Sequence, residues 1–120
     1  MMEKKVTRLY TGPDGESHFD SIEVAMKEEG VIGRHWSDFR KATALRFIGM
    51  ATDYKRGWHN APRCQYIIIL EGGLEIEIGD GTKRQFNPGD VFLAEDTTGR
   101  GHLARPLYKQ TCLFVTVALD

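Results

Sequence analysis

Alternation of apolar and polar residues is the clearest pattern in the middle of the chain. Residues 65–70 form a dense apolar, β-branched run, and residues 74–78 alternate strictly between apolar and acidic side chains. Short glycine-containing breaks follow each run, at residues 71–73 and 79–81. Strict alternation places successive side chains on opposite faces of a strand. The pattern therefore predicts a β-hairpin over residues 65–78 with one buried and one solvent-facing side.

Other short runs predict strands on both sides of this hairpin. Residues 84–94 contain the turn at 87–90, in which Pro88 fixes φ and Gly89 permits an unusual backbone conformation. The last run, residues 110–119, is apolar on both faces, which is typical of a central or interface strand. The remaining predicted strands cover residues 6–10, 21–26, 44–51, 91–94 and 102–105.

Two segments have more than one interpretation. Residues 20–29 alternate as a strand would, but Ile22 and Met26 are also four residues apart, as they would be on an acidic helix. We favour the strand and keep the helix as the alternative. Ser37 could cap a single helical turn over residues 38–41. Residues 1–5 are expected to be a frayed end.

Turns between about nine short strands, with almost no helix, predict an all-β fold. The fold class that fits this pattern is the double-stranded β-helix, a jelly-roll barrel. The 120 residues contain no linker and no internal repeat, so they fit a single domain over residues 1–120. Barrels of this kind leave one end or the interior open to a small ligand.

Charge and cysteine content exclude several classes of protein. Sixteen basic and seventeen acidic residues give a net charge of −1, without a long run of one sign, so we expect no nucleic-acid partner. No apolar run is long enough to span a bilayer, and the first residues lack the apolar core of a signal peptide. We therefore expect a cytoplasmic protein without a membrane partner. Cys64 and Cys112 are expected to be unpaired small hydrophobes.

The order of these segments resembles the cupin superfamily. A cupin's first motif places histidines and an acidic residue before a strand that ends in glycine, and here it would run from His59 to Gly72. The second motif has a proline-glycine turn and a later histidine, here Gly81, residues 88–90 and His102. The resemblance covers about half of the chain directly. It implies a cupin-type jelly-roll barrel.

Two positions depart from the metal-binding version of the family. Ala61 stands where a second histidine is expected, and Gln65 takes the place of the acidic ligand. The resemblance implies that His59, Gln65 and His102 point inward together, where they would form a weak site for a divalent transition metal. The alternative is a polar pocket without a metal, in which Gln65 hydrogen-bonds one of the histidines.

Candidate catalytic and ligand-binding residues come from the same region. His59 and His102 are the catalytic candidates, because the ordinary pKa of imidazole lies nearest neutral pH and the ring can act as a general acid or base. Aromatic side chains near the barrel mouth could line a pocket or belong to the core, and arginines could bind a carboxylate or phosphate or lie in solvent. The ligand-binding candidates are Gln65, Arg46, Tyr54, Trp58 and Tyr66, with Arg56 and Arg63 as further cations.

The functional prediction is a small cupin that binds, and could convert, a small polar metabolite such as a sugar derivative or a carboxylate. The alternatives are a non-catalytic sensor or accessory module and a metal-dependent dioxygenase-type cupin, and fold alone does not choose among them. Whether the chain is an enzyme stays open. We also expect a homodimer, because the final strand is apolar on both faces and residues 1–12 could act as a strand-exchange arm.

Overall fold

Ten strands and no helix make up the part of the chain that the computed structural model describes, residues 2–119. Alternating and β-branched segments form strands throughout, as the sequence predicts. In chain order the strands are β1 (Met2–Thr11), β2 (Ser17–Glu28), β3 (His35–Trp36), β4 (Ala42–Met50), β5 (Gln65–Glu71), β6 (Leu74–Glu77), β7 (Lys83–Phe86), β8 (Val91–Glu95), β9 (Leu103–Pro106) and β10 (Cys112–Leu119).

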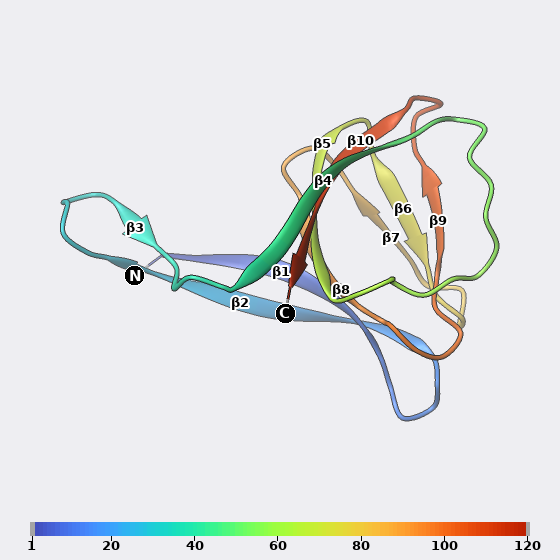
Figure 1. The fold of residues 1–120 in the computed structure, drawn as a ribbon, viewed down its shortest axis with the longest axis horizontal. Helices are drawn as coiled ribbons and strands as arrows, with labels where there is room; N and C mark the ends of the chain where they lie inside the picture. The colour runs from blue at the N-terminus through green and yellow to red at the C-terminus, as the bar shows by residue number, and fades with distance from the viewer. Residues whose placement is uncertain (1, 120) are drawn as a thin grey trace.

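Two sheets face each other and enclose the core of a barrel (Figure 1). The larger sheet has seven strands in the order β3-β2-β1-β8-β5-β10-β4, and the smaller has three in the order β7-β6-β9. Buried apolar side chains from both sheets meet between them, where the rings of Phe86 and Phe92 stack with their centroids 4.4 Å apart. The predicted all-β, jelly-roll class is confirmed.

The predicted hairpin over residues 65–78 is wrong, although both of its strands exist. β5 pairs with β8 and β10 in the large sheet, whereas β6 pairs with β7 and β9 in the small one. Gly72, with φ of 72°, takes the chain from one sheet to the other. A glycine turn has the same sequence signature whether it joins paired strands or opposite sheets. The predicted alternation itself is confirmed, since Leu74 and Ile76 are buried between the more exposed Glu75 and Glu77.

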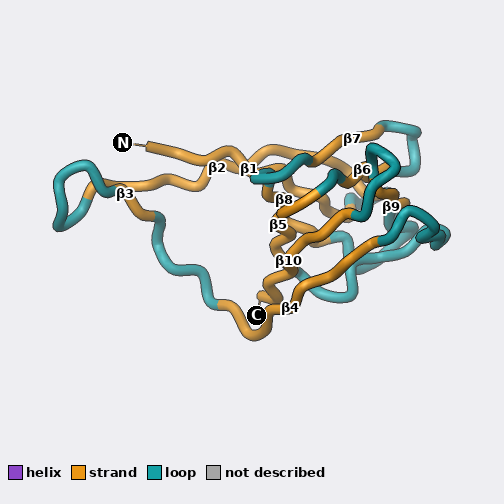
Figure 2. The backbone as a smooth tube through the Cα atoms, turned by 90° about the horizontal axis from the view of Figure 1, so that it is seen from above, coloured by secondary structure: helices purple, strands orange, loops and turns teal. Residues whose placement is uncertain are grey.

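β1 and β2 form a long hairpin, here called the arm, that extends away from the barrel (Figures 1 and 2). The pairing runs from Met2 opposite Met26 to Thr11 opposite Ser17. Residues 2–5 are therefore paired rather than frayed, whereas Met1 lies outside the described residues. The barrel end of the arm joins the large sheet, because β1 pairs in parallel with β8.

Both helical alternatives are wrong. Residues 20–28 belong to β2, since pairing with β1 along the arm outweighs the four-residue spacing of two apolar side chains. Residues 38–41 have no helical turn and form an irregular connection to β4. The Ser37 hydroxyl donates a hydrogen bond to the Asp38 carbonyl oxygen, so it does not cap a helix.

β10 is a central strand, as its two apolar faces predict, because it lies between β5 and β4. One face points into the barrel core. The side chains of the other face lie beside those of neighbouring strands in register, for example Val117 between Leu45 and Tyr66, and Val115 between Phe47 and Ile68. We call this second surface the outer face of the large sheet. Leu45 and Phe47 are 61% and 66% exposed on it.

Both cysteines are unpaired in the structure, as predicted. Cys112 is fully buried in the core, and burial raises the pKa of its thiol to about 11. Cys64 packs beside the cluster of Val6, Leu93 and Leu119. Both side chains therefore contribute packing, and a thiol as hard to ionise as that of Cys112 is a poor nucleophile at neutral pH.

Gly72→Ala is expected to destabilise the fold more than Gly81→Ala. Both glycines have positive φ, which costs an alanine about 1 kcal/mol or more. Only at Gly72 would the new Cβ also lie 2.5 Å from the backbone oxygen of Thr111, whereas nothing lies within 4 Å of it at Gly81. Chemical denaturation of both variants measures the difference. Equal losses of unfolding free energy would contradict the close approach at Gly72.

Candidate functional site

A cavity of about 240 Å³ lies inside the barrel between the two sheets, and we call it the barrel cavity. Its floor is apolar, with Ile67, Leu74 and Phe92 among the lining residues. Polar groups line the rest. They are His59, His102, Asn60, Gln65, Tyr54, Arg46, Arg56 and Thr116. An apolar cavity with a few polar groups on one side is the usual form of a small-molecule site.

His59 and His102 are held together by their own backbones. Each backbone N–H donates to the other residue's carbonyl oxygen, at 3.1 Å from His59 and 2.8 Å from His102. Gly101 makes this approach possible, because its φ is 80° and a Cβ there would lie 2.0 Å from the His59 carbonyl oxygen. The imidazole rings consequently lie side by side, with centroids 4.6 Å apart.

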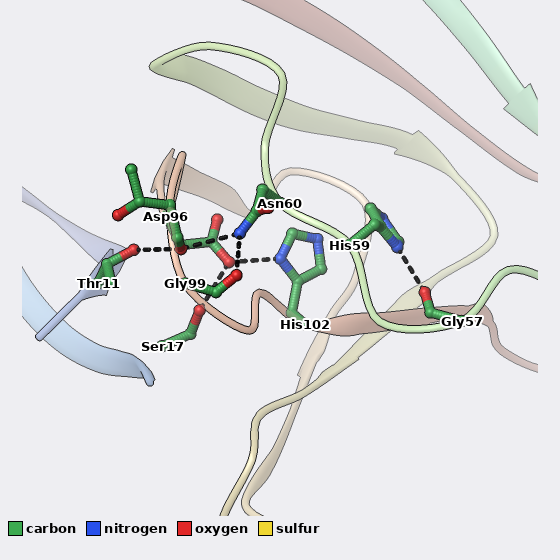
Figure 3. A network of polar contacts seen from close by, with 9 residues as sticks. Thr11, Ser17, Gly57, His59, Asn60, Asp96, Gly99 and His102 are labelled. Atoms are coloured by element: carbon green, nitrogen blue, oxygen red, sulfur yellow. Dashed lines mark hydrogen bonds and ion pairs between the residues drawn. The ribbon is translucent and has the colours of Figure 1, made fainter. Parts of the chain in front are cut away.

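A buried carboxylate orients the ring of His102. Asp96 is fully buried, and its Oδ2 lies 2.6 Å from Nδ1 of His102 and 2.8 Å from the hydroxyl of Ser17 (Figure 3). An ionised carboxylate can only accept, so Nδ1 carries the proton. The second ring nitrogen, Nε2, then has a free lone pair, and Figure 3 shows it on the side of the ring away from Asp96, toward His59. The Asp96–His102 pair therefore places a hydrogen-bond acceptor, which can also act as a base, at the cavity.

His59 is a second acceptor on the same wall. Its Nδ1 lies 2.9 Å from the carbonyl oxygen of Gly57 and donates to it, which leaves Nε2 as the acceptor of the neutral ring. Burial lowers the pKa of His59 below its ordinary value, and the nearby His102 and Arg56 lower it further, against opposing effects of Gly57 and Asp96. At neutral pH the cavity thus contains a neutral His59 beside the oriented His102.

Most of the predicted site residues meet in this cavity, and two do not. His59, Gln65, His102, Arg46 and Tyr54 all line it. Tyr66 follows Gln65 on the same strand and so points to the outer face, where it contacts the cluster around Leu93. Trp58 is 41% exposed outside the cavity and lies under the guanidinium group of Arg100. Both aromatic residues had been assigned to the cavity because they lie near its other residues in the sequence, and that prediction is wrong.

Sequence reasoning missed Asp96 and Ser17. In the sequence, Asp96 is the second of two consecutive acidic residues that follow a predicted strand. In the structure, its neighbour Glu95 pairs with Arg8 near the surface. The available signal was that a strand ending in Asp96 and a strand beginning at His102 are separated by a short glycine-containing loop. Ser17 comes from β2, far away in the chain, and nothing in its sequence context marks it.

Comparison with solved structures relates this barrel to known proteins. The cupin domain of Schizosaccharomyces pombe Cnp3 superposes with a TM-score of 0.52 at 13% identity, covering 99% of this chain and 83% of that one. The chain has the cupin fold. Two further structures are similar: protein NMB1881 of Neisseria meningitidis (TM-score 0.49, 20% identity, 63% and 72% of the two chains) and a putative ethanolamine utilization protein Q of Salmonella typhimurium (0.43, 17%, 99% and 98%).

Sequence comparisons add nothing to this fold assignment. No family model matches the chain, and no curated protein matches it either. Structural similarity at such low identity establishes the cupin fold and leaves function to the residues of the cavity. Within residues 2–119 there is no helix long and apolar enough to cross a membrane.

The residues of the barrel cavity do not fit a resident divalent metal. The ligands implied by the family resemblance are two imidazoles and the uncharged amide of Gln65, with buried Ala61 where a third imidazole would stand. The nearest carboxylate, Asp96, contacts His102 and Ser17 through its Oδ2, and its Oδ1 is buried without a hydrogen-bond partner. No group of three His, Cys, Asp or Glu side chains among the described residues is arranged to hold a metal ion.

His59 is expected to titrate below the ordinary histidine pKa of about 6.5. Because its folded-state pKa is lowered, its contribution to stability is present above pH 6.5 and is lost as the pH falls through the folded-state pKa. NMR titration of the ring proton gives the pKa directly. Denaturation between pH 7 and pH 5 should then show a smaller loss of stability in His59→Gln than in the wild type. A His59 that titrates at or above 6.5 would contradict the burial of its ring.

Proposed function

We propose that this cupin binds a small polar metabolite in the barrel cavity and exchanges a proton with it through His102. The observation that carries the proposal is the Asp96–His102 pair, because a fully buried carboxylate 2.6 Å from Nδ1 holds the ring in one tautomer and one orientation. Buried charge is costly unless paired. A cavity wall built around such a pair supports a chemical role as well as a packing role.

The proposed chemistry is general base catalysis. Nε2 of His102 takes a proton from the ligand, and the imidazolium that forms is stabilised by Asp96 behind it. Neutral His59 and the Gln65 amide then hydrogen-bond polar groups of the ligand, while the apolar floor excludes water. The cavity of about 240 Å³ favours a ligand of few heavy atoms.

A non-catalytic binding module remains the second candidate function. It would use the same cavity and the same hydrogen bonds, and it would differ only in that no proton moves. The small, partly apolar cavity favours this candidate as well as the first. Proton exchange is therefore the measurement that separates the two.

Proton transfer can be detected with two small carbonyl compounds, anionic pyruvate and neutral dihydroxyacetone. In D₂O, a C–H bond next to the carbonyl breaks, the proton passes to Nε2, the electron pair forms the enolate, and deuterium returns to carbon. Loss of the proton NMR signal measures the rate. We expect His102→Gln to lower an enzyme-dependent rate by about 100-fold or more. His18→Gln is the matched control, since that histidine also faces an aspartate, Asp14, but lies outside the cavity.

Each outcome of that experiment bears on the proposal. Accelerated exchange that depends on His102 supports the base. Saturable binding without exchange would make the protein a binding module. Absence of both binding and exchange for the two compounds would contradict a metabolite site of this size.

We also propose that the chain forms a homodimer through the outer face. A compact monomer of 13.6 kDa exposes about 6,600 Å², whereas this chain exposes 7453 Å², roughly 850 Å² more. Its radius of gyration is 15.2 Å, above the value of about 13.6 Å for a compact domain of 120 residues. A standard interface buries about 800 Å² on each partner. The excess surface therefore matches what one dimer contact would cover.

An apolar groove between the arm and the large sheet is the proposed contact region. It has a volume of about 850 Å³ and is lined by Trp36 and Phe39 on one side and by Tyr66, Ile68 and Val117 on the other. Phe47 and Leu45 continue the apolar surface onto the edge strand β4. A second copy covers both the groove and this exposed edge, which would otherwise invite aggregation. Exchange of residues 1–12 between partners stays a prediction, since here β1 pairs within its own chain.

Light scattering at micromolar concentration tests the dimer. We expect the wild type to have twice the mass of one chain. Phe47→Asp should raise the dimer dissociation constant by about 100-fold or more, because it removes a large apolar contact and buries a charge. The control is Tyr108→Ser, which removes an aromatic that is 60% exposed in the β9–β10 loop and that bonds Asn87. A monomeric wild type, or a Phe47→Asp variant as dimeric as the control, would refute this interface.

A further inference from the structure

Three arginines beside the barrel cavity have no acidic partner within the described residues. Some arginines of the chain are paired, as Arg8 is with Glu95 and Arg105 is with Glu75 and Glu77. Arg46, Arg56 and Arg63 form no ion pair with a described carboxylate. Their positive charges are therefore available to a ligand.

A second cavity brings two of these arginines together. It also has a volume of about 240 Å³ and is lined by Arg46, Arg63, Gln65 and Thr116; we call it the arginine cavity. The remaining lining residues are Ala44, Leu45 and Ala118. Ala44 and Ala118 stand opposite each other on β4 and β10, so this part of the cavity wall has only methyl side chains.

The two cavities meet at shared residues. Arg46, Gln65 and Thr116 line both of them. Strand pairing brings these three residues together. Thr116 on the central strand β10 stands opposite Arg46 on β4. Two residues further along β10, Ala118 stands opposite Gln65 on β5. A ligand that extends past these three side chains would reach from the arginine cavity to the histidines of the barrel cavity.

Charge distinguishes these cavities from the rest of the protein. Their described lining residues include three arginines and two histidines but no aspartate or glutamate. The whole chain has a net charge of −1, so this positive lining is a local feature. Low-dielectric walls focus such a field and favour a ligand of opposite sign. Arginine binds carboxylates and phosphates in particular, because its planar fork can donate two parallel hydrogen bonds.

We propose that the ligand of this cupin is a small organic anion whose carboxylate or phosphate group is bound by Arg46 and Arg63 in the arginine cavity. The uncharged body of the ligand then enters the barrel cavity and brings its reactive end to His102. This inference rests on the proposed function and narrows its ligand to one chemical class. It also fixes the orientation of the ligand, since Arg63 lines only the arginine cavity and His102 lines only the barrel cavity.

The anion site is tested with probes that carry only the anionic group. Acetate and inorganic phosphate are titrated into ¹⁵N-labelled protein at constant ionic strength, and the amide signals of Gln65 and Thr116 are followed. Neutral acetamide, which has nearly the shape of acetate, is the control probe. We expect both anions to give saturable shifts at these signals and acetamide to give none. The anion that binds more tightly identifies the group that the natural ligand carries.

Variants that each remove one positive charge distinguish anion binding at this site from nonspecific attraction to the protein surface. Arg46→Gln is expected to weaken binding of the preferred anion by about tenfold or more, and Arg63→Gln by a smaller factor, since an ionic hydrogen bond contributes about 1.5–3 kcal/mol. Arg34→Gln removes the same charge at the turn between β2 and β3, where Arg34 stacks on Trp36, and should change the affinity by less than twofold. Retained shifts elsewhere in the spectrum show that each variant is folded.

Two results would overturn the inference. One is the absence of saturable binding by both anions, and the other is binding that acetamide matches or that Arg46→Gln leaves unchanged. A different measurement would contradict the proposed function. That measurement is the binding and proton exchange of neutral dihydroxyacetone at His102. A protein that binds dihydroxyacetone in the barrel cavity but neither anion would retain the metabolite site and lose the anion anchor.

Discussion

The hydrogen bonds of the buried Asp96 connect the start of β2 to the two histidine segments of this site. Its Oδ2 accepts from Ser17 at the start of β2 and from His102 before β9, and its backbone oxygen accepts from the N–H of Ala61. A buried charge without such partners would destabilise the fold by several kcal/mol. The same bonds that make this charge tolerable fix the barrel end of the arm and the two histidine segments relative to one another. Stability and the orientation of His102 thus have a common cause.

Local patterns predicted the strands well because strand formation here depends on neighbouring residues. The apolar-acidic alternation of residues 74–77 became β6, and the run of residues 112–119 became the central strand β10. Pairing between strands depends on distant residues, and there the prediction failed. β5 and β6 looked like a hairpin, but their partners come from residues 83–119, which the local pattern does not identify.

The candidate site was also predicted only in part. His59, Gln65 and His102 were found because the family resemblance gave them an order along the chain, and the structure brings all three to one cavity. Tyr66 was misplaced although it follows Gln65 directly, since alternation along β5 sends it to the opposite face. Asp96 could not be distinguished from Glu95 by sequence alone. Only the fold shows that one is fully buried against an imidazole while the other pairs with Arg8.

The charges on the two sides of His102 complement each other. Asp96 lies behind Nδ1 at 2.6 Å, and the ring lines the barrel cavity together with Arg46 and Arg56. The arginines place a positive field on the cavity side of the ring. A bound anion would neutralise that field, so that an imidazolium formed by proton transfer lies between two negative groups. In this arrangement the ligand's own charge helps to stabilise the protonated form of the base, so binding at the arginines and proton transfer at His102 depend on each other.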